Sequence, residues 1–344
     1  HTEQGCEVRR RNHPCCPFKM MVGDMVNEKQ KGLAYSIQSF LCNAGSLVGF
    51  LFPFIFTWIG ISNIAPQGVV PDSVIYSFYI GAAILILCVI YTTVKVKEMP
   101  PAEYAEYHGI TEEEKKEKIN MVKLLVKAPK AFWTVGLVQF FCWFAFMFMW
   151  TYTNGSVAAN VFDAPTVETV VNGANKVVLD TKSIQYQNAA DWVGVLFAVQ
   201  AIGSVLWAVC IPMFKNRKLI YSLSLVLGGI GFISTYFVHN QYVLFISFLL
   251  IGCAWAAMLA LPFTILTNAL SGGHMGTYLG LFNGTICIPQ IVAATLGGSI
   301  LALFTPKGML PPEINMLVMA GVMLIIGAVC VYLIKETKGE QAKA

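Results

Sequence analysis

Residues 17–36 read PFKMMVGDMVNEKQKGLAYS, and residues 262–280 read PFTILTNALSGGHMGTYLG. Both stretches begin with Pro-Phe and a short apolar run. Each then crosses a small polar hairpin and enters a segment led by glycine, at Gly32 and Gly276. The two stretches align with one gap, which indicates an internal repeat. An internal repeat has to be recognised before the fold is predicted. This pair predicts that the protein contains two related halves.

The composition predicts a membrane protein. Of 344 residues, 56% are hydrophobic and 12% are charged, whereas soluble domains carry about 25% charged residues. Apolar stretches recur at the length of roughly 20 residues that a helix needs to cross a bilayer. We predict an all-α, polytopic protein of about eight transmembrane helices. Their expected cores are 33–59, 75–95, 131–153, 191–213, 219–238, 242–268, 277–303 and 314–334.

The basic residues predict the orientation of these spans. Lysines precede the first span, fill the 96–130 connection and recur in KNRK at 215–218, whereas the alternate connections are poor in lysine and arginine. By the positive-inside rule, both chain ends lie in the cytoplasm of a plasma or inner cell membrane. Residues 97–130 stand out as a charged cytoplasmic linker. Thr111 and Glu114 there have capping-box spacing, and an amphipathic surface helix follows.

The repeat also predicts how the chain is organised. If Pro262 lies near the end of the fourth span of one bundle, Pro17 ends the fourth span of the other, so about four helices are missing before it. We therefore expect five parts. They are an irregular or aberrant start (1–16), a remnant of the N-terminal bundle with the end of helix 4 and helices 5 and 6 (17–96), the linker (97–130), a six-helix C-terminal bundle (131–337) and a tail (338–344).

This organisation resembles the major facilitator superfamily, whose two bundles hold a binding site between them at mid-membrane. VGDMVNEKQKGLAYS at 22–36 is similar to the family signature after the fourth helix. LPFTILTNAL (261–270), GLFNGTICIPQIVAATLGG (280–298) and WFAFMFMWTYTNG (143–155) resemble helices ten, eleven and seven of sucrose:proton symporters and their glycoside-transporting relatives. Asn154 and Asn216 stand where those patterns have acids, which leaves the coupling ion and the solute open.

The resemblance implies a secondary active transporter that moves a neutral glycoside or oligosaccharide with a proton by alternating access. Polar residues inside spans usually face protein or a water-filled cavity. Along 131–153, aromatic and amide residues recur at four-three-four spacing and share one face, which suits the apolar faces and hydroxyls of a sugar. The predicted solute-binding residues are Gln139, Trp143, Trp150, Asn154, Asn283, Gln290, Gln38, Asn43 and Gln200.

Glycines at four-residue spacing predict close helix crossings, which serve either static packing or the rolling of one bundle on the other. The predicted packing residues are Gly45, Gly49, Gly276, Gly280 and Gly284. Pro289 removes a backbone donor and is expected to kink its helix.

The acids and bases give three candidate gating or coupling residues: Asp24, Lys31 and Asp191. Between Asp191 and Glu313 the sequence has no Asp or Glu, so the coupling carboxylate is expected in the missing helices. Asp24 is expected at the cytoplasmic end, where it can pair with a basic group in a closed state.

Two other interpretations remain. The chain is a carrier of another small solute, or it is a truncated membrane protein that transports nothing. An enzyme is not expected, because no nucleophile elbow, HExxH or phosphate-binding loop is present. We expect no cofactor, metal or nucleic-acid partner. Cys6, His13, Cys15 and Cys16 lack the spacing of a zinc site. The expected partners are a sugar-like solute, a coupling proton and the lipid bilayer.

Overall fold

A computed structural model describes residues 28–61, 70–96, 121–171, 174–214, 216–269, 275–306 and 308–334. The helices are α2 (Glu28–Trp58), α3 (Asp72–Lys95), α6 (Met121–Val126), α7 (Lys130–Asn160), α8 (Ile184–Cys210), α9 (Arg217–Ser234), α10 (Leu244–Ala269), α11 (Met275–Phe282), α12 (Gly284–Phe304) and α13 (Ile314–Cys330). Strands β1 (Thr166–Val171) and β2 (Ala174–Leu179) and two short 3-10 turns, Ile211–Met213 and Val331–Leu333, complete the described elements.

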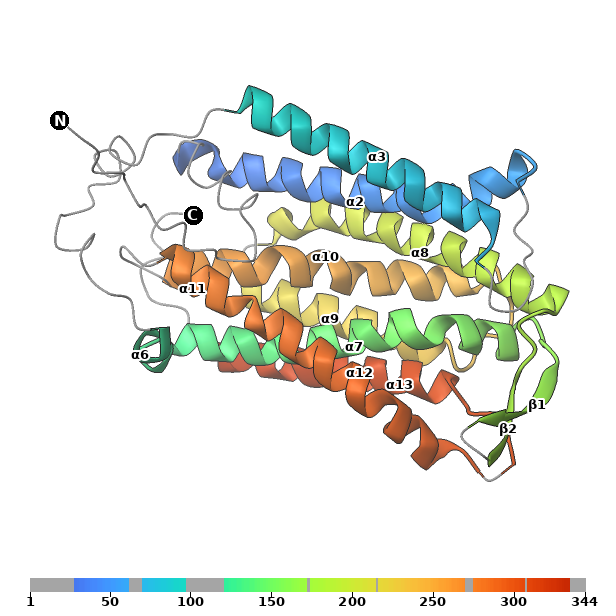
Figure 1. The fold of residues 1–344 in the computed structure, drawn as a ribbon. Helices are drawn as coiled ribbons and strands as arrows, with labels where there is room; N and C mark the ends of the chain where they lie inside the picture. The colour runs from blue at the N-terminus through green and yellow to red at the C-terminus, as the bar shows by residue number, and fades with distance from the viewer. Residues whose placement is uncertain are drawn as a thin grey trace, which may run out of the picture.

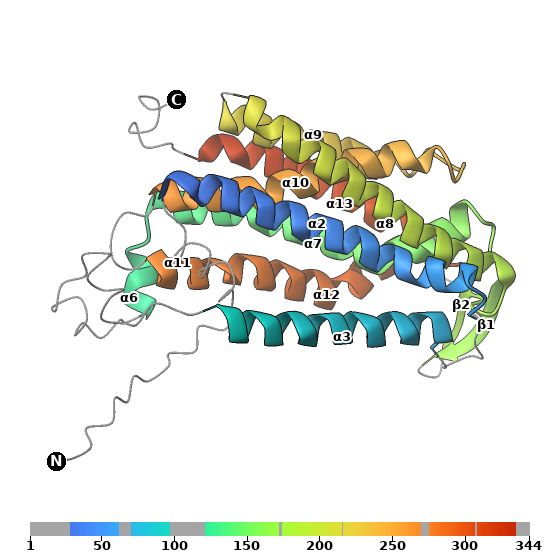
Figure 2. The ribbon, with the colours of Figure 1, turned by 90° about the horizontal axis from the view of Figure 1, so that it is seen from above.

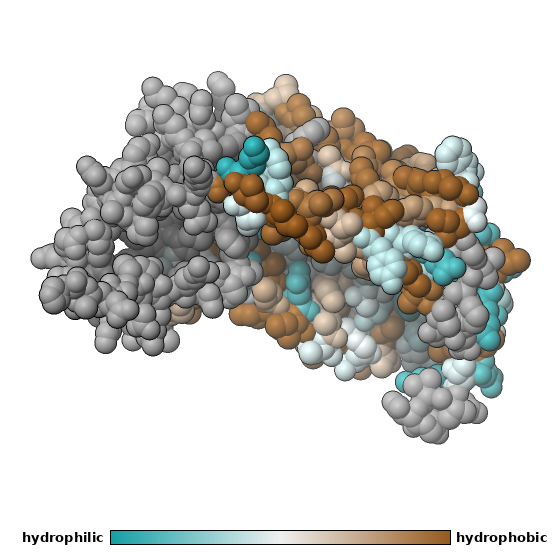
Figure 3. Space-filling model, turned by 45° about the horizontal axis from the view of Figure 1, so that its top comes forward, coloured by the Kyte–Doolittle hydropathy of each residue, from teal (hydrophilic) through white to brown (hydrophobic). Residues whose placement is uncertain are grey.

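The long helices run side by side with their axes roughly aligned (Figure 1). Within the described residues, seven spans are long and apolar enough to cross a membrane. The apolar part of α2, Ala44–Trp58, is shorter. Apolar side chains cover much of the outer surface of these helices (Figure 3), as a lipid-facing surface requires. The predicted all-α, multi-pass architecture is therefore confirmed.

The six C-terminal spans form one packed body. Helix α7 contacts α8, α10, α12 and α13, while α10 packs against α8 and α9, and α13 packs against α9. Large side chains such as Phe146, Phe232 and Phe248 are fully buried between them. Close-packed aromatic rings replace lipid in this core, so dispersion contacts hold the helices together.

The closest helix crossings occur at glycines that the four-residue pattern did not single out. A Cβ on Gly231 of α9 would lie 2.6 Å from the carbonyl oxygen of Ser247 on α10, and one on Gly321 of α13 would lie 2.7 Å from that of Gly229. By contrast, a Cβ on Gly45 or Gly49 would meet no described atom within 4 Å. The expected close crossing at Gly45 and Gly49 is thus not formed within the described part of the chain.

Helix α2 packs along α8, and α3 packs against α2. The rings of Phe50 and Phe197 lie 5.4 Å apart, and Gly194 on α8 faces the main-chain carbonyl of Phe50, which a Cβ would approach to 3.2 Å. The small residue at this contact therefore belongs to α8. Viewed from above, α3 lies at one edge of the bundle and α9 at the opposite edge (Figure 2).

Two local features were not predicted. The helix is interrupted at Asn283, between α11 and α12, whereas Pro289, where a kink is predicted, is buried within α12. Gly284 next to the break supplies the flexible backbone. The connection after α7 forms an antiparallel hairpin, with Thr166 opposite Leu179. In the sequence, Asn172-Gly173 stands between two runs rich in β-branched residues, a pattern typical of a β-hairpin. Most of the linker, including Thr111 and Glu114, lies outside the described residues. The one linker helix within the described residues is α6.

Candidate functional site

Three tryptophans from two helices form a ring cluster near the middle of the bundle. Trp143 and Trp150 lie seven residues apart on α7, which places them on one face, and their ring centroids are 6.4 Å apart. Trp255 of α10 meets both edge-on, at 5.8 and 5.7 Å. Trp143 is buried, whereas Trp150 is 40% exposed. Trp150 is therefore the most exposed ring of the cluster.

A small cavity of ≈ 30 Å³ adjoins this cluster where α2 meets α7, α8 and α10. Its lining residues are Ser46, Phe50, Trp150, Gln200, Ala201 and Trp255. The structure thus brings together Trp150 and Gln200, both of which the sequence predicted. Sequence reasoning missed Trp255, although a single tryptophan within an apolar span was a usable signal, and it missed Ser46 and Phe50. Among the described residues, the wall combines aromatic faces, one amide and one hydroxyl, and it has no charged side chain.

Gln139 and Trp143 lie one turn apart on α7, behind the cavity wall. The side-chain amide of Gln139 donates to the main-chain carbonyl of Met258 on α10 at 3.0 Å. The oxygen Oε1 of Gln139 and the indole Nε1 of Trp143 are buried and have no hydrogen-bond partner among the described residues. Each unpaired buried group costs roughly 1–3 kcal/mol. An acceptor and a donor on α7 therefore remain unpaired within the described structure, although neither side chain lines the cavity.

Asn154 lies further along α7, away from this cavity. Its Nδ2 donates to the hydroxyl of Tyr186 on α8 at 2.9 Å, and its Oδ1 is buried without a partner in the described structure. Asn154 thus belongs to the end of the bundle near the hairpin, which we name the hairpin end. It does not line the tryptophan cavity.

Asn283 and Gln290 lie on the α11–α12 segment, which packs mainly against α7. Asn283 is half-buried, and its Nδ2 lies 3.5 Å from the sulfur of Cys287. Gln290 is half-buried beside the buried Pro289. Neither residue lines the described cavity. The sequence predicted that Gln139, Asn283 and Gln290 face one shared cavity. Instead, the Gln139 side chain contacts α10, whereas Asn283 and Gln290 lie on the segment that packs against α7.

The remaining candidates are distributed as follows. Gln38, Asn43 and Lys31 lie on α2, but their side chains are outside the described part, as is all of Asp24. Asp191 is half-buried on α8. Gly276 and Gly280 lie on α11, and a Cβ on Gly284 would meet only Ile288, at 3.9 Å. No group of three His, Cys, Asp or Glu side chains suited to a metal occurs within the described ranges.

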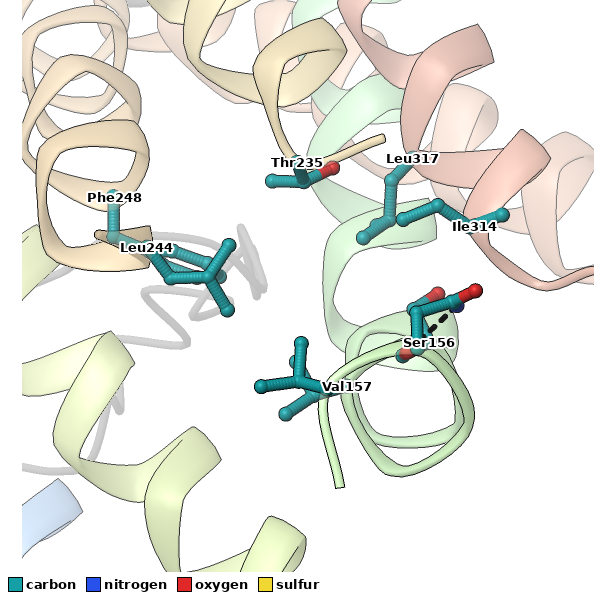
Figure 4. Close-up of a pocket in the computed structure, with 9 residues that line it drawn as sticks. Ser156, Val157, Thr235, Leu244, Phe248, Ile314 and Leu317 are labelled. Atoms are coloured by element: carbon teal, nitrogen blue, oxygen red, sulfur yellow. Dashed lines mark hydrogen bonds between the residues drawn. The ribbon is translucent and has the colours of Figure 1, made fainter. Parts of the chain in front are cut away.

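A second, smaller space of ≈ 10 Å³ lies at the hairpin end between α7, α9, α10 and α13 (Figure 4). Leu244 and Phe248 of α10 and Ile314 and Leu317 of α13 supply apolar parts of its wall. Its polar side chains are already engaged, since the hydroxyl of Ser156 donates to the carbonyl of Tyr152 at 2.7 Å. This space is a packing void and not a solute site.

The family comparison is decisive. The family model described as Major Facilitator Superfamily matches residues 18–174 and 164–344. The chain belongs to the major facilitator superfamily. It matches no curated protein. Membership in this superfamily makes the chain a multi-pass membrane protein of a class that transports small solutes, with the site between two helical bundles. In this major facilitator protein, the tryptophan cavity lies where α2 meets the C-terminal helices.

Proposed function

We propose that the protein carries a neutral glycoside or oligosaccharide, with a proton, by alternating access. The observation that supports this is the composition of the cavity wall, where Trp150 and Trp255 flank Gln200 and Ser46. Aromatic rings bind the apolar faces of a sugar, and a few polar groups fix its hydroxyls. A cation or an anion would instead require an opposite charge in the wall, and the described wall has none.

The size of the cavity supports a closed state. A volume of ≈ 30 Å³ accommodates about one water, whereas small-molecule pockets occupy roughly 300–1,000 Å³. A disaccharide can enter only if α2 moves away from α7, α8 and α10. We propose that α2 and α3 belong to one bundle and α7–α13 to the other, with residues 97–130 as the linker. Opening would then be a rigid-body movement.

Uptake into proteoliposomes tests the proposal. The full chain is reconstituted, and labelled disaccharides are offered with and without an inward proton gradient. We expect saturable uptake that the gradient increases. The matched controls are empty vesicles and Trp133→Ala, which removes an exposed tryptophan of α7 at 53% exposure, away from the cavity. Uptake of charged amphipathic solutes alone would favour another carrier, and no uptake of any solute would favour the non-transporting alternative.

A further inference from the structure

Glu313 stands at the start of α13, after Pro311-Pro312, in an unusual position for a carboxylate. It occupies the N-cap position, yet its side chain makes no capping hydrogen bond, although free N–H groups there attract carboxylates. The side chain lies instead against Gly155 of α7, where a Cβ would overlap the carboxyl oxygens. Only glycine leaves room for the carboxyl group at this place.

Three further polar side chains, from α7 and α8, are linked to this carboxyl group by electrostatic interaction or by a hydrogen bond between themselves. Tyr152 lies one turn before Gly155 on α7, and its hydroxyl interacts electrostatically with Glu313. Tyr186 of α8 does so as well. Asn154 donates to the Tyr186 hydroxyl and keeps a buried, unpartnered oxygen within the described residues. We name Glu313, Tyr152, Tyr186 and Asn154 the carboxyl cluster.

Among the described residues, no basic side chain forms an ion pair with this carboxyl group. The charged or titratable side chains on the surrounding elements are Asp163, Asp180, Lys182, Asp191 and His239. Within the described structure none forms an ion pair with Glu313. His239 contacts the carbonyl oxygen of Asn160 at 3.2 Å, and Lys182 is exposed. Burial without a positive partner disfavours the charged form, and it raises the pKa of the Glu313 carboxyl to about 7.

Protonation would remove the charge from this carboxyl group. A carboxylate only accepts hydrogen bonds, whereas a carboxylic acid also donates one. Because burial disfavours the charged form of Glu313, uptake of one proton lowers the cost of keeping this side chain between the helices.

We propose that the carboxyl cluster is a proton-binding site in which Glu313 takes up one proton and holds the start of α13 against α7. Loss of the proton leaves a buried carboxylate and loosens this contact. The proposal concerns binding of a proton at the hairpin end. It does not depend on which solute is carried, or on whether transport uses this proton.

Infrared difference spectroscopy of the full chain in lipid nanodiscs tests it between pH 4 and pH 9. We expect the C=O band of a protonated carboxyl to disappear with a midpoint near pH 7. It should be absent in Glu313→Gln and unchanged in Glu168→Gln, which removes an exposed carboxylate of β1. Gly155→Ala keeps the carboxyl but displaces it from its place, so the midpoint should fall towards the ordinary value of 4.5.

Three results would overturn the proposal. They are the absence of a band titrating above pH 6, a band that persists in Glu313→Gln, and a midpoint that Gly155→Ala leaves unchanged. Replacing potassium by sodium is expected to leave the midpoint in place. A midpoint that falls with sodium concentration would show a metal-cation site instead. Because the readout is the proton itself, failure here is distinguishable from failure to transport a sugar.

Discussion

The side-chain amide of Gln139 on α7 donates to the main-chain carbonyl of Met258 on α10, 119 residues later. Pro262 follows Met258 by four residues inside α10. A proline has no N–H to donate to the carbonyl four residues earlier, so that carbonyl is left without its usual helical partner. Gln139 supplies the missing donor. Gln139, which the sequence predicted to bind a solute, thus stabilises the contact between α7 and α10. Only its Oε1 has no partner among the described residues.

This relationship predicts a coupled stability effect. Gln139→Leu should destabilise the bundle by roughly 1–3 kcal/mol, because a buried carbonyl loses its donor. Pro262→Ala restores a backbone donor, so Gln139→Leu should cost less in that background. Thermal unfolding of the four proteins in detergent measures the interaction. If the stability changes of the two single variants simply add in the double variant, Gln139 does not compensate for the donor that Pro262 removes from the Met258 carbonyl.

The exposed tryptophan and the amide of the cavity should control solute affinity. Trp150→Ala and Gln200→Ala are each expected to raise the KM for disaccharide uptake about tenfold, which corresponds to about 1.4 kcal/mol of lost binding. Protein inserted in the membrane should be unchanged for Trp150→Ala, because that side chain is 40% exposed. An unchanged KM in both variants would argue against the cavity as the solute site.

Trp143 should behave differently from Trp150. Its ring is buried against Trp150 and Trp255, so Trp143→Ala creates a void that costs roughly 3–5 kcal/mol. We expect a clear loss of thermal stability that Trp143→Phe largely restores. Fluorescence-detected size exclusion after heating distinguishes the two tryptophans. Equal losses for Trp143→Ala and Trp150→Ala would contradict the assigned burial.

The glycines of the structure make a matched pair of tests. A Cβ on Gly252 of α10 would overlap the main-chain carbonyl of Gln200 on α8, so Gly252→Ala should separate two helices and cost about 1–3 kcal/mol. Gly49→Ala should be neutral or slightly stabilising, since a Cβ there meets no described atom within 4 Å. The apparent melting temperatures measure both. A larger loss of stability for Gly49→Ala than for Gly252→Ala would instead support the close helix crossing predicted at Gly45 and Gly49.

Glu313 predicts a pH dependence of stability with a defined sign. Burial raises its pKa from 4.5 to about 7, so between these values the folded state holds a proton that the unfolded state has released. Stability from this group is complete below about pH 4.5 and is lost as the pH rises through 7. The loss should be of order 1–3 kcal/mol after allowance for partial exposure. Melting curves of Glu313→Gln should lack this decline, and those of Glu168→Gln should retain it.

The sequence was sufficient for the membrane architecture. Apolar runs of about 20 residues must become helices in lipid, because each backbone amide needs an internal partner there. Every expected core therefore overlaps a described helix, from α2 to α13, although the 219–238 core extends past the end of α9 at Ser234. The row of Trp143, Phe146 and Trp150 was also readable, because helical period alone places these rings on one face. Their ring contacts confirm the row.

The positions of partners needed the tertiary structure. Spacing placed Gln139 on the same face as the tryptophans, but only the packing of α10 showed that its amide is used by Met258. Glu313 was seen in the sequence only as the end of an acid-free stretch. Its burial follows from Gly155, 158 residues earlier by number, whose missing side chain leaves room for the carboxyl group.

The amino-acid sequence by itself determined which segments form long apolar helices and which rings share a helical face. These properties depend on the hydrophobicity of a segment and on the helical period, and both can be read from residues that are close in sequence. Only the tertiary structure decided which polar atoms are paired and which remain open, and where glycines admit a neighbouring helix. Those properties depend on contacts between residues on different helices, some of them more than a hundred positions apart, and no local pattern encodes them.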